Sequence, residues 1–291
     1  MSVWIPQLTQ DGSYTFFSEE FGEAFHSRQG ARAEAFAKFA DATNLVQKAQ
    51  QPSIKLLDVC YGLGYNTAAA IEVIHSVNPN CNVEVYGLEL DSTVPIGATS
   101  PELLQLWSSE TQRILQSLAQ HHHYQNSNLN AQLLIGDARH MIDQLIEQHF
   151  QADAIFFDPF SPRRCPQLWT IQFFQRVAQC LAPTGTLSTY SRSASVRSAL
   201  IDAGLAIGTI PLGSNPLPHD WSQGTIAAWR SDTLTPLSAM ELEHLHTRAA
   251  VPYRDLTLRD SAETILQRHL QEQTASTLES TSSWRRRWKL V

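Results

Sequence analysis

Residues 55–66 read KLLDVCYGLGYN, and this stretch limits what the chain can fold into more than any other. The apolar run over residues 54–60 predicts a buried strand, Gly62 and Gly64 predict a tight turn, and the alanine-rich residues after them predict a helix. Glycines let the backbone come close to a ligand, and the start of the helix offers it free N–H groups. A dinucleotide-binding fingerprint would have a third glycine where Thr67 stands, so the chain departs from it. The pattern indicates an α/β fold with a nucleotide-like ligand at this turn, although a turn without a ligand can carry the same glycine pair.

Three further apolar strands are predicted, and each ends in an acidic residue. They cover residues 83–91, 132–135 and 152–157, and their acids are Glu89, Asp137 and Asp158. The carboxyl ends of parallel strands meet at one edge of a sheet, which is where open α/β sheets bind their ligands. We expect Glu89 to accept hydrogen bonds from the two hydroxyls of a ribose. Each acid could instead cap the helix that follows it, and the two roles are compatible. Because all four predicted strands end in an acid or a glycine, we favour a ligand-binding site at this edge of the sheet.

Composition excludes several classes of protein. The chain of 291 residues is long enough for one domain of about 200 residues with extensions. Its four cysteines are scattered without metal-ligand spacing, which argues against zinc and against a disulfide framework and favours a reducing cytoplasm. No apolar run is long enough for a membrane span, and no signal-peptide pattern is present. The net charge of −7 does not indicate nucleic-acid binding, although a local basic face is compatible with it. We therefore expect a cytoplasmic protein with no membrane partner and no metal.

Three segments are predicted from the order of these patterns. Residues 1–50 should form a hairpin and an amphipathic helix that pack on the core, and residues 51–230 should form the main domain. Residues 231–291 change to a polar composition with a short helix at 261–272, disorder at 273–283 and a basic end. This last segment is expected to be a helical, partly disordered tail.

Three isolated features have two possible interpretations each. His26, just before the first predicted helix, is either a structural histidine or part of a site. The triplet at residues 121–123 is either a metal site or, as we favour, a solvated helix end. The basic end, WRRRWK at residues 284–289, suits stacking on bases and phosphate contact, or serves only solubility.

Four motifs resemble those of one enzyme family. They are GEAFHS at residues 22–27, DPFSP at 158–162, PQLWT at 166–170 and GTLSTY at 185–190. Over residues 22–229 the chain resembles the methyltransferase module of the MnmC-like enzymes that make 5-methylaminomethyl-2-thiouridine in tRNA. The DPFSP block is similar to that of the stand-alone form, and the absence of a second G-x-G-x-x-G unit predicts that the FAD oxidase module is missing. Cys60 stands where many methyltransferases have glycine.

The resemblance implies a class I S-adenosylmethionine-dependent methyltransferase fold, a Rossmann-like seven-stranded mixed sheet with helices on both faces, over residues 51–230. It implies S-adenosyl-L-methionine as cofactor and tRNA as partner. The implied reaction converts 5-aminomethyl(-2-thio)uridine to 5-methylaminomethyl(-2-thio)uridine at the wobble position, after a separate enzyme has supplied the aminomethyl group.

The resemblance also implies roles for individual residues. The predicted cofactor-binding residues are Asp58, Gly62, Gly64, Asn66, Glu89, Asp137 and Ala138. Asp158 is the predicted catalytic residue, because a carboxylate there can orient a cationic amine and help its proton leave. The predicted substrate-binding residues are His26, Phe160, Arg163, Arg164, Tyr190 and Trp221, since a flipped base suits an aromatic rim with arginines.

Two other functions are compatible with the same residues. One is methylation of a small-molecule amine, which an acidic pocket would also suit. The other is a non-catalytic Rossmann-like binding module. Transfer of labelled methyl groups to bulk tRNA separates the first from the tRNA reaction, and failure to bind S-adenosylmethionine would favour the second.

Overall fold

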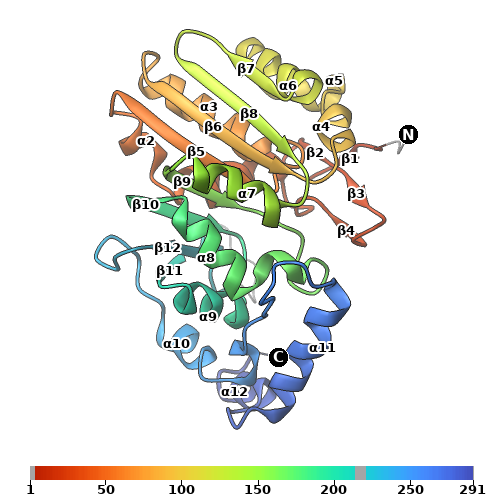
Figure 1. Cartoon of the computed structure of the whole chain (residues 1–291), viewed down its shortest axis with the longest axis vertical. Helices are drawn as coiled ribbons and strands as arrows, with labels where there is room; N and C mark the ends of the chain where they lie inside the picture. The colour runs from red at the N-terminus through yellow and green to blue at the C-terminus, as the bar shows by residue number, and fades with distance from the viewer. Residues whose placement is uncertain (1–3, 214–220, 291) are drawn as a thin grey trace.

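A mixed sheet forms the centre of the computed structural model, which describes residues 4–213 and 221–290 (Figure 1). Within these residues the sheet has eight strands in the order β11-β12-β10-β9-β5-β6-β8-β7. Their bounds are β5 Ser53–Val59, β6 Asn82–Glu89, β7 His123–Gln125, β8 Leu129–Ile135, β9 Ala152–Phe157, β10 Leu181–Thr189, β11 Ala206–Ile210 and β12 Gly224–Ala228. The strands β10, β9, β5, β6 and β8 are mutually parallel, so their carboxyl ends share one edge as predicted.

The sheet has one strand more than the seven that we expected. The additional strand is β7, which pairs antiparallel with β8 at the edge. It forms because His122 adopts a left-handed conformation (φ 57°) that reverses the chain directly after helix α6 (Ser109–His121). The histidine triplet thus ends a helix and begins a strand. No group of metal-ligating side chains that could hold a metal ion is found among the described residues.

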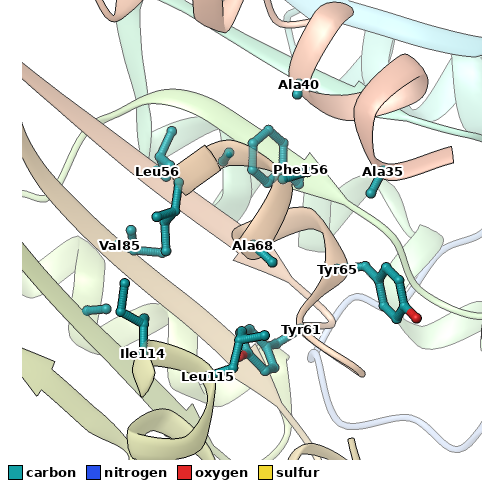
Figure 2. Close-up of a cluster of buried hydrophobic side chains, with 14 of the residues drawn as sticks. Ala35, Ala40, Leu56, Tyr61, Tyr65, Ala68, Val85, Ile114, Leu115 and Phe156 are labelled. Atoms are coloured by element: carbon teal, nitrogen blue, oxygen red, sulfur yellow. The ribbon is translucent and has the colours of Figure 1, made fainter. Parts of the chain in front are cut away.

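Helices cover both faces of the sheet and enclose two hydrophobic cores. On one face lie α1 Ala31–Glu34, the π-helix η1 Ala35–Asp41, α2 Leu45–Lys48, α3 Tyr65–Val77 and α6, with α4 Thr93–Gly97 and α5 Pro101–Leu104 beside them. On the other lie α7 Ala138–Glu147, the 3-10 helix η2 Pro166–Trp169, α8 Ile171–Gln179 and α9 Ala194–Asp202. Figure 2 shows the first core, where Leu56 and Val85 of the sheet meet Ala68 of α3 and Ile114 of α6. Fully buried strand side chains on both faces explain the continuous apolar runs in the sequence.

The N-terminal segment crosses the carboxyl edge of the sheet. The predicted Asp11-Gly12 turn joins β1 (Gln7–Leu8) to β2 (Tyr14–Thr15), and Gly12 supplies the positive φ of 81° that this turn needs. A second short pair, β3 (Phe17–Ser18) and β4 (Glu23–Ala24), follows. The segment brings aromatic side chains over the sheet edge.

The C-terminal segment is folded, so the expected disorder of residues 273–283 is wrong. Its helices are α10 Ala239–His244, the 3-10 helix η3 Arg248–Ala250, α11 Ala262–Ala275 and α12 Thr281–Arg287, near the β11 edge of the sheet (Figure 1). Trp284 is 1% exposed and its ring stacks on that of His244 at 4.1 Å. Glu241 forms a buried ion pair with Arg197 at 2.8 Å. Polar composition predicted disorder, but these few buried contacts order the segment. No helix in the described ranges has the length and apolar character to cross a membrane.

Candidate functional site

A cleft opens where β5, β6 and β9 end, beneath the N-terminal segment. Of the predicted cofactor and catalytic residues, Gly62, Glu89 and Asp158 line it. A second part of the cleft, which shares Cys60 and Leu90 with the first, continues past the end of β8. The strand ends that the sequence pattern aligned therefore do surround one cavity.

The two glycines of the turn have different surroundings. Gly62 (φ 53°) lines the cleft, and a Cβ there would lie 3.3 Å from the ring of Phe25. Gly64 (φ 77°) begins helix α3, and a Cβ there would lie 2.5 Å from the hydroxyl oxygen of Tyr61. Cys60 also has a positive φ of 68°. The tight turn thus depends on both glycines, but the structure brings only Gly62 to the cleft.

Glu89 binds the turn through its carboxylate. Its Oε2 accepts a hydrogen bond from the N–H of Gly62 at 2.7 Å, and its Oε1 accepts one from the N–H of Asp91 at 2.9 Å. The residue is only 7% exposed. Burial raises the pKa of Glu89 to about 7, against the two backbone hydrogen bonds. A positively charged ligand in the cleft would favour its ionised form.

Asp58 and Asn66 lie behind the cleft rather than in its wall. Asp58 is fully buried and accepts a hydrogen bond from the hydroxyl of Thr67 at 2.7 Å, and burial raises its pKa to about 7. The amide of Asn66 donates to Oδ2 of Asp158 at 2.9 Å. Oδ1 of Asp58 and Oδ1 of Asn66 have no hydrogen-bond partner. Both residues therefore support the turn and Asp158 and leave buried acceptors beside the cleft.

Asp158 stands at the end of β9 among other acids. Its N–H donates to the carbonyl oxygen of Val59 at 3.1 Å, which fixes the backbone where β9 leaves the sheet. Burial, and next the negative charge of Glu34, raise the pKa of Asp158 well above its usual range. Asp158 is thus prepared to take up a proton or to pair with a cation.

Glu34 was not singled out from the sequence. It forms an ion pair with Lys38 one helical turn later, and its Oε2 accepts a hydrogen bond from the N–H of Ser27 at 3.1 Å. Lys38 lies in the π-helix, a form found often at functional sites. The i,i+4 spacing of the two charges was visible in the sequence, but such a pair usually lies on a solvated surface. The sequence could not show that this pair is mostly shielded from solvent, with 12% of Glu34 and 22% of Lys38 exposed.

Aromatic side chains from the N-terminal segment close the cleft. Phe160 stacks on Phe21 with ring centroids 4.5 Å apart, and Phe25 meets Phe160 edge-on at 4.9 Å. Trp4 also lines the cleft. Phe160 was predicted. Phe25 lies in the GEAFHS motif but was not assigned to the site, and Phe21 and Trp4 had no local signal.

The second part of the cleft combines apolar side chains with oxygen acceptors. Asp137 and Ala138, both predicted, line it together with Leu90 and Gln167. Leu90 is 56% exposed, and the Oε1 atom of Gln167 is buried without a hydrogen-bond partner. Asp137 caps helix α7 by accepting from the N–H of Arg139 at 2.9 Å. A flat, apolar ring with an exocyclic amino group would suit this end.

Five of the predicted substrate-binding residues line neither part of the cleft as the structure describes it. They are His26, Arg163, Arg164, Tyr190 and Trp221. His26 lies 3.3 Å from the hydroxyl of Thr15, and burial lowers its pKa to about 4, so the ring is neutral. The hydroxyl of Tyr190 donates to the carbonyl oxygen of Pro159 at 2.9 Å, next to Asp158. Tyr190 thus supports the loop that begins at Asp158, whereas His26 packs against Thr15 and Tyr65.

The two arginines and the tryptophan lie farther out. Arg163 and Arg164 are exposed on the loop after β9, and the guanidinium of Arg164 lies over Gly22. Trp221 packs under the guanidinium of Arg192, 4.2 Å from its ring centre, and edge-on to Trp284. Trp221 therefore belongs to the contact with the C-terminal segment, while the two arginines are exposed on the loop after β9.

Comparisons with known proteins agree with this geometry. A family model described as S-adenosyl-L-methionine-dependent methyltransferase matches residues 101–213. The bifunctional MnmC protein of tRNA 5-methylaminomethyl-2-thiouridine biosynthesis from Polaromonas naphthalenivorans is 29% identical over 250 residues, which are 80% of this chain and 37% of that protein. An uncharacterized protein of Methanocaldococcus jannaschii is 28% identical over 89% of this chain and 69% of its own length. The crystal structure of MnmC2 from Aquifex aeolicus has a TM-score of 0.81 at 29% identity, covering 95% of this chain and 87% of that one.

The chain thus spans 37% of the length of the bifunctional relative. The comparisons confirm the predicted class I methyltransferase fold and its S-adenosyl-L-methionine cofactor. They also confirm the resemblance to the methyltransferase module of MnmC.

Proposed function

Starting from a methyltransferase that uses S-adenosylmethionine and is similar to the MnmC module, we propose that this chain methylates an amine on tRNA. The proposed reaction converts 5-aminomethyl(-2-thio)uridine at the wobble position to its 5-methylaminomethyl form. The aminomethyl group would come from a separate enzyme. The observation that carries the proposal is the carboxylate of Asp158, which lines the cleft among buried acids.

The residues of the cleft fit the cofactor. Leu90, an exposed apolar side chain, and the unpartnered oxygen of Gln167 suit a purine ring with an amino group. Glu89 suits the hydroxyls of a ribose, since each carboxylate oxygen has a lone pair beyond its backbone hydrogen bond. The buried acceptor atoms of Asp58 and Asn66 add negative potential beside the turn. When bound, the cofactor supplies an electrophilic methyl group on a cationic sulfonium.

Asp158 would prepare the amine. An aminomethyl group is mostly protonated at neutral pH, so one N–H bond must break before its nitrogen has a lone pair to share. Asp158 accepts this proton, and its raised pKa favours the transfer. With the cofactor bound, the nitrogen would form a bond to the methyl carbon as the carbon–sulfur bond breaks, and the electron pair of that bond would stay on sulfur. Asn66 holds the carboxylate by its hydrogen bond at 2.9 Å.

The aromatic rings suit the rest of the substrate. A wobble base must leave its stack to reach a cleft, and an aromatic face compensates part of the lost stacking. Phe160 offers such a face, and it now stacks on Phe21 at 4.5 Å. Arg163 and Arg164, exposed on the same loop, are suited to the phosphates of the anticodon loop. His26, Tyr190 and Trp221 would act only indirectly, by supporting these elements.

Two assays test the proposal. Nucleoside mass spectrometry of tRNA from a strain lacking the protein should show 5-aminomethyl(-2-thio)uridine accumulating at the expense of its methylated form. Purified protein and labelled S-adenosylmethionine should then label this tRNA at that nucleoside, and RNase digestion before the reaction should abolish the labelling.

The acidic cleft also favours a small amine as the substrate, so the same assay is run with polyamines in place of tRNA. If polyamines become labelled and tRNA does not, the substrate is a small amine and the proposal of a tRNA substrate is wrong. Absence of cofactor binding by calorimetry would leave a binding module and contradict both reactions.

A further inference from the structure

The C-terminal segment reaches the cofactor cleft through one arginine. Arg139 of α7 forms a bidentate contact with Asp137. Its Nε donates to Oδ1 at 3.1 Å, and one Nη donates to Oδ2 at 2.7 Å. The other Nη donates to Oδ2 of Asp255 at 2.9 Å and to the carbonyl oxygen of Asp260 at 3.0 Å. One guanidinium therefore connects the wall of the cleft with the loop before α11.

Asp255 is itself firmly held. It is fully buried, and its Oδ1 accepts from the backbone N–H groups of Arg259 at 3.2 Å and Asp260 at 3.3 Å. Its own N–H donates to the side chain of Gln172 on α8 at 2.8 Å. A buried carboxylate with this many fixed donors has one orientation, unlike an exposed ion pair whose side chains move.

Asp137 depends on this arrangement for its geometry. Its side chain is 31% exposed at the cleft. Within the described ranges its carboxylate accepts hydrogen bonds from Arg139 alone, and these fix its plane. Partial burial raises the pKa of Asp137, but the hydrogen bonds and charge of Arg139 outweigh it and lower the pKa below its usual value. Asp137 is therefore an ionised, oriented acceptor at the end of the cleft that suits a purine.

We propose that Asp255 is a positioning residue for cofactor recognition, acting through Arg139 on Asp137. The C-terminal segment then contributes to recognition of the amino group of adenine, although none of its described residues, 231–290, lines the cleft. This inference rests on the cofactor and is independent of the methyl acceptor.

Calorimetry on the full chain tests the inference with two ligands that differ at one group. S-adenosylhomocysteine carries the exocyclic amino group, and S-inosylhomocysteine has a carbonyl in its place. Asp255→Asn keeps the acceptor for the loop N–H groups but removes the charge that holds Arg139. We expect its Kd for S-adenosylhomocysteine to rise about three- to tenfold, the effect of losing one hydrogen bond's net contribution. The Kd for S-inosylhomocysteine should change less, so the preference for adenine narrows.

Asp260→Asn is the matched control. Asp260 lies in the same loop, but its carboxylate pairs with Arg268 at 2.7 Å and does not contact Arg139. This variant should keep both Kd values. Arg139→Lys breaks the connection from the other side while leaving Asp255 in place, because a lysine cannot bind both carboxylates in the forked geometry. Arg139→Lys should show the same smaller preference for S-adenosylhomocysteine over S-inosylhomocysteine. If Asp255→Asn does not fold, this variant tests the inference in its place.

Unchanged affinity, or an equal loss for both ligands, in Asp255→Asn and Arg139→Lys would overturn the inference. So would a change of the same size in Asp260→Asn.

Discussion

Replacing Glu89 with glutamine tests the cofactor site, because the structure specifies what is lost. The carboxylate accepts the N–H of Gly62 at 2.7 Å and that of Asp91 at 2.9 Å, one on each oxygen. Glutamine has a single acceptor oxygen, so one of these two N–H groups must face an NH₂ group. The substitution therefore affects the folded protein as well as the ligand.

Two magnitudes follow. Leaving one buried N–H without an acceptor costs about 1–3 kcal/mol of unfolding free energy. Loss of charge-assisted hydrogen bonds to the ribose hydroxyls costs about 1–3 kcal/mol of binding, which raises the Kd for S-adenosylmethionine about 5- to 150-fold. Both effects should appear together in the same variant.

The pH dependence gives the sharper signature. Burial raises the pKa of Glu89 to about 7. We expect the ribose hydroxyls of the cofactor to bind the ionised form. Below this pKa a proton must leave before binding, so wild-type affinity should fall with decreasing pH, approaching about tenfold per unit. Above it the affinity should level off. In Glu89→Gln the part of the slope that belongs to this residue disappears.

Isothermal titration calorimetry from about pH 6 to about pH 8 measures the Kd and its slope with pH. A denaturant titration measures the unfolding free energy. Glu84→Gln is the control, because Glu84 lies on the same strand but pairs with Lys55 at 2.8 Å away from the cleft. Wild-type affinity and an undiminished pH slope in Glu89→Gln would remove Glu89 from the cofactor site.

Three further predictions concern the C-terminal segment. Trp284→Ala should lower the unfolding free energy by about 3–5 kcal/mol, because the ring is 1% exposed, and a denaturant titration checks this; a loss below about 1 kcal/mol would contradict the packing. Glu241→Gln leaves the guanidinium of Arg197 buried without its counter-charge and should cost about 3–5 kcal/mol while S-adenosylmethionine affinity stays the same; a stable variant would show that the pair is dispensable. If the basic end contacts tRNA, glutamine at both Arg285 and Arg286 should reduce the salt dependence of tRNA binding by up to about two charges, and an identical slope would exclude that contact.

The sequence was most informative about features that depend on residues close together in the chain. Buried parallel strands need apolar side chains on both faces, so the runs ending at Glu89 and Asp158 were visible as strands. Parallel strands also share one edge, which brought Asp137 to the same cleft without any knowledge of packing.

Features created by distant contacts could not be predicted in this way. Trp284 belongs to a segment whose composition is typical of disorder, and its burial against His244 is one of the distant contacts that order the segment. Phe21 stacks on Phe160 although the two lie far apart in the sequence. Gly64 and Asp58 are residue types that often contact a ligand. In the tight turn, however, Gly64 packs against Tyr61, and Asp58 accepts a hydrogen bond from Thr67.

The role of Asp158 as the proton acceptor is the central claim, and a single-turnover methylation assay of Asp158→Asn tests it most directly. The substrate is tRNA from the strain lacking the protein, and the readout is the rate of 5-methylaminomethyluridine formation at saturating S-adenosylmethionine. Asparagine keeps an acceptor for the amide of Asn66, now 2.9 Å from Asp158, so the fold and the cofactor affinity should remain. The rate should fall by about 10²–10⁴, the usual contribution of a general base. Asp153→Asn, at the other end of β9, should keep the wild-type rate. A rate close to wild type in Asp158→Asn would contradict the account.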